Sequence, residues 1–221
     1  AFVIDKCADY WSTISTWAEQ GFIRSTFARQ AIPMTWDFAE CNPFSESTGN
    51  WMAMVGWVKK AVEGLPGRGN AEVVQRDARA RVADAVGAVI SSDPPYYDNI
   101  SYADLSDFFF VWLRQNLRTI WPDEFATLST PKVDELIANE YRAGSRREAK
   151  AHFESGMASF MKAVAGAQNP TAPATIYYAY KATESKDGEI RSTGWDTFLQ
   201  GVLDAGLQVT ATWPLRTELG N

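Results

Sequence analysis

The sequence predicts an α/β fold with a doubly wound parallel sheet, and three observations support this prediction. Short apolar runs rich in β-branched and aromatic residues alternate with longer segments of helical periodicity. The apolar run 86–90 leads into two adjacent prolines at 94 and 95, which end a strand stiffly. A chain of 221 residues is also long enough for a well-buried core. Because such sheets bind ligands at the carboxyl ends of their strands, a site is expected at the Pro-Pro turn.

The spacing of apolar residues, glycines and prolines predicts the individual elements. Residues 1–30 are expected to be mostly helical, and residues 31–47 to be extended with turns. Further helices are expected at 51–63, between 77 and 86, and at 105–117, 133–141, 146–167 and 194–205. Strands are expected at 72–75, 86–90, 175–180 and 207–213. Residues 1–70 therefore precede the core, and residues 71–221 form the α/β core of one compact domain.

Composition excludes some classes of protein. A net charge of −6 argues against a non-specific nucleic-acid binder, but not against a base-modifying enzyme with DNA contacts in another segment. Since no apolar stretch of membrane-spanning length and no signal peptide is visible, a cytoplasmic protein without a membrane partner is expected. Cys7 and Cys41 lack metal-ligand spacing, so they are expected to be reduced and no metal site is predicted. His152 is the only histidine, which argues against a His-based triad.

The Pro-Pro turn carries the chemistry that this sequence offers most clearly. Asp93 precedes Pro94 and Pro95, and Tyr96 follows them. Proline has no N–H, so the turn is expected to present carbonyl oxygens outward. Together with the Asp93 carboxylate, these oxygens can accept both N–H bonds of an amino group on a flat heterocycle, while the Tyr96 ring stacks on its face. The alternative is a structural proline turn with a capping aspartate.

The segment 92–100, Ser-Asp-Pro-Pro-Tyr-Tyr-Asp-Asn-Ile, resembles motif IV of the S-adenosylmethionine-dependent amino-methyltransferases that act on DNA bases. With Tyr102–Phe109 after it, it resembles more narrowly the large adenine-specific DNA methylases that carry a DUF1156 region. The same family is matched by residues 26–34, 36–40, 42–44 and 213–218. The resemblance implies a Rossmann-like methyltransferase fold with additional helices. It also implies DNA as a partner, with the target adenine extruded from the helix.

The resemblance assigns roles to the residues of the turn. Asp93 accepts one N–H of the target amino group, the Pro94 carbonyl accepts the other, and Tyr96 stacks on the base. An aspartate at position 93 favours adenine over cytosine, by analogy with the family. The predicted catalytic residues are Asp93, Pro94, Pro95 and Tyr96. The predicted substrate-binding residues are Tyr97, Asp98, Asn99, Tyr178 and Lys181. A turn role for Asp98 and Asn99 is the alternative.

The cofactor implied by the resemblance is S-adenosylmethionine. Asp77 follows the strand expected at 72–75, where related methyltransferases place a residue that recognises the adenine of the cofactor; the alternative is a helix N-cap. The Gly-rich loop expected for this cofactor is not found, because a helix rather than a strand precedes Gly64, Gly67 and Gly69. Family members are much longer. The chain is therefore expected to be an internal fragment that lacks much of the cofactor half and belongs with the remainder of a larger polypeptide or with modification-system subunits.

These observations predict a fragment of an adenine-N6 DNA methyltransferase from a modification or phage-defence system, inactive when isolated. One alternative keeps the enzyme class and changes the substrate to cytosine N4, RNA or protein. Another is a catalytically silent methylase-like domain that binds nucleic acid or a partner protein.

Overall fold

The structure is a computed structural model that describes residues 1–97, 100–179, 183–184, 190–191 and 193–214. The chain forms two compact units, each with its own core. The first comprises Ala1–Gln75 and Ile100–Glu135, and the second comprises the described residues of Arg76–Asn99 and Leu136–Asn221. Residues 100–135 thus belong to the first unit, although they follow the Pro-Pro turn of the second in the sequence.

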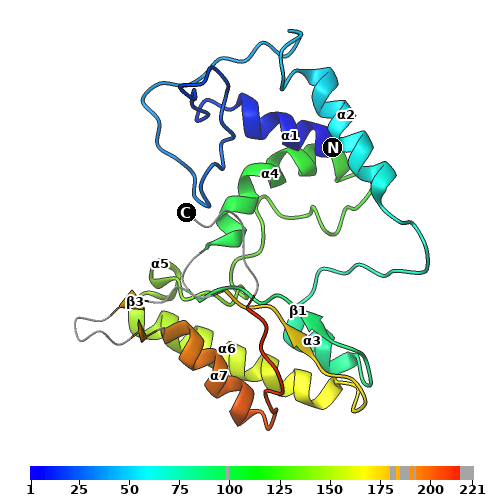
Figure 1. The fold of residues 1–221 in the computed structure, drawn as a ribbon, viewed down its shortest axis with the longest axis vertical. Helices are drawn as coiled ribbons and strands as arrows, with labels where there is room; N and C mark the ends of the chain where they lie inside the picture. Colours follow the sequence, from blue (N-terminus) through cyan, green and yellow to red (C-terminus); the bar gives the residue numbers. More distant parts are fainter. Residues whose placement is uncertain (98–99, 180–182, 185–189, 192, 215–221) are drawn as a thin grey trace. The chain divides into compact units, whose positions relative to one another are not determined.

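The first unit is built on three helices, α1 (Phe2–Trp11), α2 (Trp51–Gly64) and α4 (Tyr102–Leu117). Helix α1 packs against both α2 and α4 (Figure 1). Each helix buries an apolar side chain: Cys7 from α1, Met54 from α2 and Phe110 from α4. Helix α2 begins where the Asn50 side chain accepts a hydrogen bond from the Ala53 amide at 2.8 Å, which makes Asn50 its N-cap.

Helix α1 ends at Trp11, so the prediction of a mostly helical segment over residues 1–30 is wrong beyond that residue. The Thr26 amide and hydroxyl both donate to the Asp9 carbonyl, each at 2.7 Å. The Ser12 and Thr26 hydroxyls lie 2.6 Å apart, and Ser15 and Thr26 are buried. Side chains that hydrogen-bond to backbone compete with a continued helix, which explains why the chain folds back here.

Asp107 of α4 binds the loop that follows the helix through hydrogen bonds and an ion pair. Its Oδ1 accepts hydrogen bonds from the Thr130 amide at 2.8 Å and the Thr130 hydroxyl at 2.6 Å. The Lys132 ammonium lies 2.6 Å from its Oδ2. Desolvation raises the pKa of Asp107, but the hydrogen bonds from Lys132 and Thr130 outweigh it and lower the pKa from 3.8 to about 2.

This arrangement predicts a pH-dependent stability for the first unit. Because the pKa of Asp107 is lower in the folded chain, its stabilising effect is complete above 3.8 and is lost as the pH falls from there through about 2. In the Asp107→Asn variant we expect a lower Tm at neutral pH and a shallower loss of Tm across this acid window. Thermal unfolding followed by circular dichroism over that pH range measures both. Asp123→Asn, at an exposed position in the same unit, should keep the wild-type slope. Equal slopes for Asp107→Asn and wild type would contradict this assignment.

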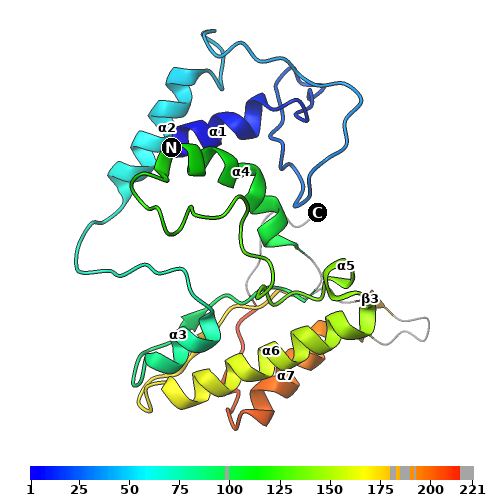
Figure 2. The same cartoon turned by 180° about the vertical axis from the view of Figure 1, so that it is seen from behind.

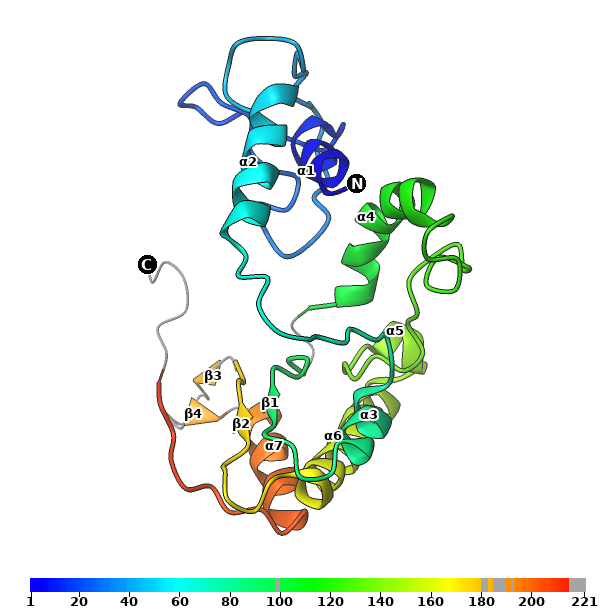
Figure 3. The same cartoon turned by 90° about the vertical axis from the view of Figure 1, so that its right-hand side faces the viewer.

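The second unit contains a parallel β-α-β arrangement. Strand β1 (Ser91–Ser92) pairs in parallel with β2 (Thr175–Ile176), with Ser91 opposite Thr175 and Ser92 opposite Ile176. Figure 3 shows the two strands side by side. Helix α6 (Arg146–Ala167) lies between them in the chain. The shorter elements are α3 (Ala78–Asp84), α5 (Glu140–Ala143), β3 (Thr183–Glu184), β4 (Ile190–Arg191) and α7 (Thr193–Asp204). Strands β3 and β4 pair antiparallel.

Helix α6 provides most of the core of this unit, and α3 and α7 pack against it (Figure 2). Its buried side chains recur at helical spacing on one face: Phe153, Met157, Phe160, Met161 and Val164. The core is completed by Ile90 before β1 and by Phe198 and Val202 of α7. Ser145 is the N-cap of the helix: its hydroxyl accepts from the Glu148 amide at 3.2 Å and donates to the Glu148 carboxylate at 2.8 Å.

The helices predicted at 51–63, 105–117, 146–167 and 194–205 are confirmed as α2, α4, α6 and α7, and the short helix before residue 86 is confirmed as α3. Gly206 has φ +78° after α7, as expected of a capping glycine. Helix boundaries depend on caps and periodicity within a short stretch of chain. That local dependence explains why the sequence located them.

The strands were predicted less accurately than the helices. The run 86–90 is not a continuous strand: Gly87 turns the chain with φ +76°, Ala88 makes an isolated parallel bridge with Gln168, and β1 begins only at Ser91. Of the strand predicted at 175–180, the described residues 175–179 form a strand only at Thr175–Ile176, and Tyr180 lies outside the described residues. The strands predicted at 72–75 and 207–213 are wrong, and Val73 and Trp213 in them are exposed. A strand requires a partner for its backbone groups, and in the described residues these two segments have none.

The helix predicted at 133–141 is also wrong. The chain is non-helical up to Asn139, and only Glu140–Ala143 form the short helix α5. The Asn139 side chain accepts hydrogen bonds from the amides of Tyr141 and Arg142, at 3.0 and 3.1 Å, and so starts the helix at residue 140. Just before it, the Ala138 amide donates to the Tyr97 carbonyl at 2.7 Å, which draws this segment toward the Pro-Pro turn.

Candidate functional site

The Pro-Pro turn follows directly on the carboxyl end of β1. The Ser92 carbonyl accepts a hydrogen bond from the Tyr177 amide at 2.8 Å, so the pairing with the segment that contains β2 extends to the last residue before Asp93. Asp93 is exposed, Pro94 is buried, and Pro95 and Tyr96 are half-buried. The turn is thus anchored at its first proline, while its carboxylate faces solvent.

The carboxylate and the aromatic ring of the turn are joined to each other. The Tyr96 hydroxyl donates a hydrogen bond to Asp93 Oδ1 at 2.9 Å. A carboxylate has about four acceptor positions, so this bond leaves Asp93 capacity for a further donor such as an amino group. Both side chains are thereby held on the same side of the two prolines.

Parallel pairing brings Tyr178 to the same edge. Because β1 and β2 run in the same direction, the residues after Ile176 lie beside the residues after Ser92. The rings of Tyr96 and Tyr178 meet edge to face, with centroids 5.9 Å apart at 86°. Tyr97 turns inward instead, and its ring contacts Phe153 of α6 edge to face at 5.0 Å. Of the two tyrosines of the turn, Tyr96 therefore belongs to the site and Tyr97 to the core.

Tyr178 is part of a larger aromatic group, which we call the aromatic wall: Tyr178, Trp195 and Phe198. The rings of Tyr178 and Phe198 are stacked at 4.4 Å and 14°, and those of Trp195 and Phe198 at 5.6 Å and 18°. Sequence reasoning did not identify Trp195 and Phe198 as site residues. Their spacing of three residues in a predicted helix was a signal that both lie on one face.

Asp77, the predicted cofactor residue, is the N-cap of α3. Its Oδ1 accepts from the Arg79 amide at 2.9 Å, and its carboxylate also receives the Arg79 guanidinium, with Nη2 2.6 Å from Oδ2. The pKa of Asp77 is lowered, chiefly by the hydrogen bond from the Arg79 side chain. The capping role considered for this residue is therefore present in the structure, and both carboxylate oxygens are hydrogen-bonded to Arg79.

Three predicted substrate-binding residues, Asp98, Asn99 and Lys181, lie outside the described residues. The structure therefore places Asp93, Pro94, Pro95, Tyr96 and Tyr178 at one edge of the β1–β2 pair. It places Asp77 at the start of α3.

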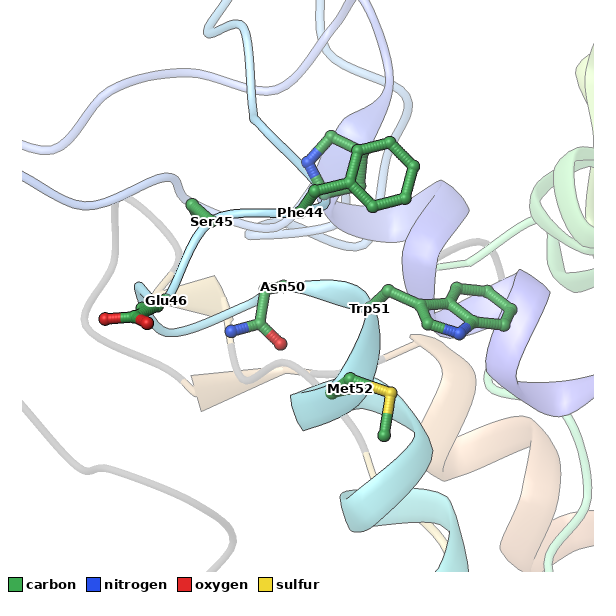
Figure 4. A pocket seen from close by; sticks show the side chains of 7 residues that line it. Phe44, Ser45, Glu46, Asn50, Trp51 and Met52 are labelled. Atoms are coloured by element: carbon green, nitrogen blue, oxygen red, sulfur yellow. The ribbon is translucent and has the colours of Figure 1, made fainter.

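A separate pocket of about 540 Å³ lies in the first unit (Figure 4). Phe44, from the loop before α2, and Trp51 and Met52, from the first turn of α2, give it an apolar lining. Its Asn50 side chain serves the helix cap and donates to the Ser47 carbonyl at 2.9 Å. The Asn50 side chain in this pocket thus serves the local fold.

A membrane-spanning helix and a metal-binding cluster are both absent from the described part of the chain. No helix there is long and apolar enough to cross a membrane. Nor do three or more His, Cys, Asp or Glu side chains gather there in a way that could hold a metal ion. Cys7 and Cys41 are free thiols in the first unit, and burial raises the pKa of each.

Comparison of the chain with models of protein families, with curated proteins and with solved structures finds no match.

Proposed function

We propose that this chain carries the target-base half of an S-adenosylmethionine-dependent DNA methyltransferase that modifies the N6 amino group of adenine. The observation that supports the proposal best is the hydrogen-bonded pair Asp93–Tyr96 at the carboxyl end of a parallel strand, with Tyr178 beside it. Such an edge is where α/β sheets bind their ligands.

Methylation of an aromatic amino group requires that the residues of the turn hold the base in place and accept hydrogen bonds from both N–H groups of the amine. An aromatic amine is a weak nucleophile because its lone pair is delocalised into the ring, so the enzyme must orient the nitrogen. The Asp93 carboxylate accepts one N–H and aligns the amino group. The Tyr96 ring stacks on the extruded base, which holds it in one plane. The Pro94 carbonyl serves as second acceptor.

S-adenosylmethionine, when bound, supplies the activated methyl group. The described residues do not fit it at Asp77, because both oxygens of that carboxylate are engaged by Arg79. No step is therefore assigned to Asp77. We infer that the cofactor contacts come from other parts of a longer parent protein, of which this chain is the base-binding segment.

The test is methyl transfer from labelled S-adenosylmethionine to unmethylated genomic DNA by the full-length parent protein, followed by digestion to nucleosides. We expect the label in N6-methyladenine. Label in N4-methylcytosine would retain the reaction and change the base. If no nucleoside carries label while the protein is folded and binds the cofactor, DNA is not the substrate, and RNA, protein or a silent binding domain becomes the better interpretation.

A further inference from the structure

Tyr178 connects the Pro-Pro turn to helix α7. On one side its ring meets the Tyr96 ring edge to face at 5.9 Å. On the other side it stacks on Phe198, which is only 6% exposed, and lies tilted against Trp195 at 6.2 Å. Tyr96 therefore rests against a ring that is itself held by the core of the second unit.

The hydroxyl of Tyr178 adds a second point of attachment. It donates to the Gly194 carbonyl in the first turn of α7 at 3.3 Å. Stacking fixes the plane of a ring, and a hydrogen bond at its far end fixes its rotation and depth. Together they fix how far the Tyr178 ring reaches toward Tyr96.

Gly194 is what allows this approach. A Cβ at this position would lie 3.1 Å from Tyr97 Cβ and 3.2 Å from the Tyr178 hydroxyl oxygen. Both distances are shorter than an ordinary van der Waals contact, so a side chain at 194 would push Tyr97 and the Tyr178 hydroxyl aside by a few tenths of an ångström. Gly201, the second glycine of α7, has room for a side chain. A Cβ there would meet only Met161 Cγ, at an ordinary van der Waals distance of 3.9 Å.

We propose that Tyr178 is a positioning residue that sets the place of the Tyr96 ring, and that Gly194 sets the place of Tyr178. As far as it concerns methyl transfer, this inference rests on the proposed function. The ring of Tyr96 defines the plane in which the extruded base lies, and the amino nitrogen must lie within reach of Asp93. A displaced ring therefore misplaces the reacting nitrogen, which lowers the rate of transfer more than it weakens the binding of DNA.

The position of Tyr96 can be measured without any activity. Site-specific incorporation of 3-fluorotyrosine at position 96 gives one ¹⁹F resonance that reports the surroundings of that ring. We expect Gly194→Ala, which keeps the Tyr178 ring, to shift this resonance. Tyr178→Leu should shift it as well, but that variant also removes the ring current of Tyr178. The matched controls are Tyr177→Leu, at the neighbouring half-exposed tyrosine, and Gly201→Ala, on the same helix; both should leave it in place. Circular dichroism establishes whether each variant is folded. If Tyr178→Leu does not fold, Gly194→Ala alone tests the positioning role.

The kinetic arm uses the full-length parent protein and the nucleoside assay. Tyr178→Leu should lower kcat by about tenfold to a hundredfold with little change in KM for S-adenosylmethionine. Tyr178→Phe keeps the stacked ring but loses the hydroxyl bond to Gly194, so its rate should lie between those of Tyr178→Leu and the wild type. An unchanged ¹⁹F resonance in both folded variants would overturn the positioning role. A shifted resonance in a protein that transfers no methyl group to DNA would keep the structural link and overturn its role in methylation.

Discussion

If the proposed function is right, replacing Asp93 by alanine should remove nearly all methyl transfer in the full-length protein while leaving its fold intact. Removing one preorganised hydrogen-bonding group that acts on the reacting centre typically lowers kcat by about a hundredfold to a thousandfold. Asp93 is exposed, and the one described hydrogen bond it loses is from the Tyr96 hydroxyl, so the change in unfolding free energy should stay within about 1 kcal/mol. The measurement is label in N6-methyladenine, with thermal unfolding recorded on the same samples.

Two further variants separate the causes. Asp93→Asn keeps an acceptor oxygen and should retain part of the rate. Tyr96→Phe keeps the stacking ring but removes the hydroxyl that Asp93 accepts, so it tests whether that bond contributes to orientation. Asp84→Ala, at an exposed position in the same unit, serves as the matched control and should behave as wild type. Loss of cooperative unfolding in Asp93→Ala would point to a structural turn instead.

Replacing Phe153 by alanine should cost the second unit about 3–5 kcal/mol, because a fully buried aromatic side chain leaves a cavity that the surroundings fill only in part. Phe153 is 0% exposed and lies on the core face of α6. Its ring also supports Tyr97 of the Pro-Pro turn, edge to face at 5.0 Å. The loss of stability should therefore reach the candidate site as well as the helix.

The two units call for a measurement that is specific to one of them. Urea unfolding followed by circular dichroism reports the whole chain, whereas hydrogen exchange of the α6 amides reports the second unit alone. Leu203→Ala, on α7 at 59% exposure, is the matched control and should change the unfolding free energy by no more than about 0.5 kcal/mol. Wild-type protection of the α6 amides in Phe153→Ala would show that this core is not what holds the unit together.

The candidate site was predictable from the sequence only in part. Asp93, Pro94, Pro95 and Tyr96 are adjacent in the chain, so their proximity needs no tertiary information. Tyr178 was predicted as a substrate residue from its place near the end of the strand expected at 175–180, and parallel pairing brings it beside Tyr96. Its packing on Trp195 and Phe198 could not be predicted, because that depends on how α7 lies against the β1–β2 pair.

Helices with strong local signals could be located from the amino-acid sequence without knowledge of the fold. The Asn50 and Ser145 caps and the apolar face of α6 specify where α2 and α6 begin and which side of α6 is buried. Helical hydrogen bonds join residues four apart, so the information lies within the segment itself.

Tertiary structure alone decided the strands and the grouping of segments. Strand β1 begins at Ser91 rather than in the apolar run before it, because its partner is Thr175, more than eighty residues away in the chain. The segment 207–213 has the composition of a strand but no partner within the described residues. Backbone groups of a strand are satisfied only by another segment, and no pattern within one segment specifies which partner it will find.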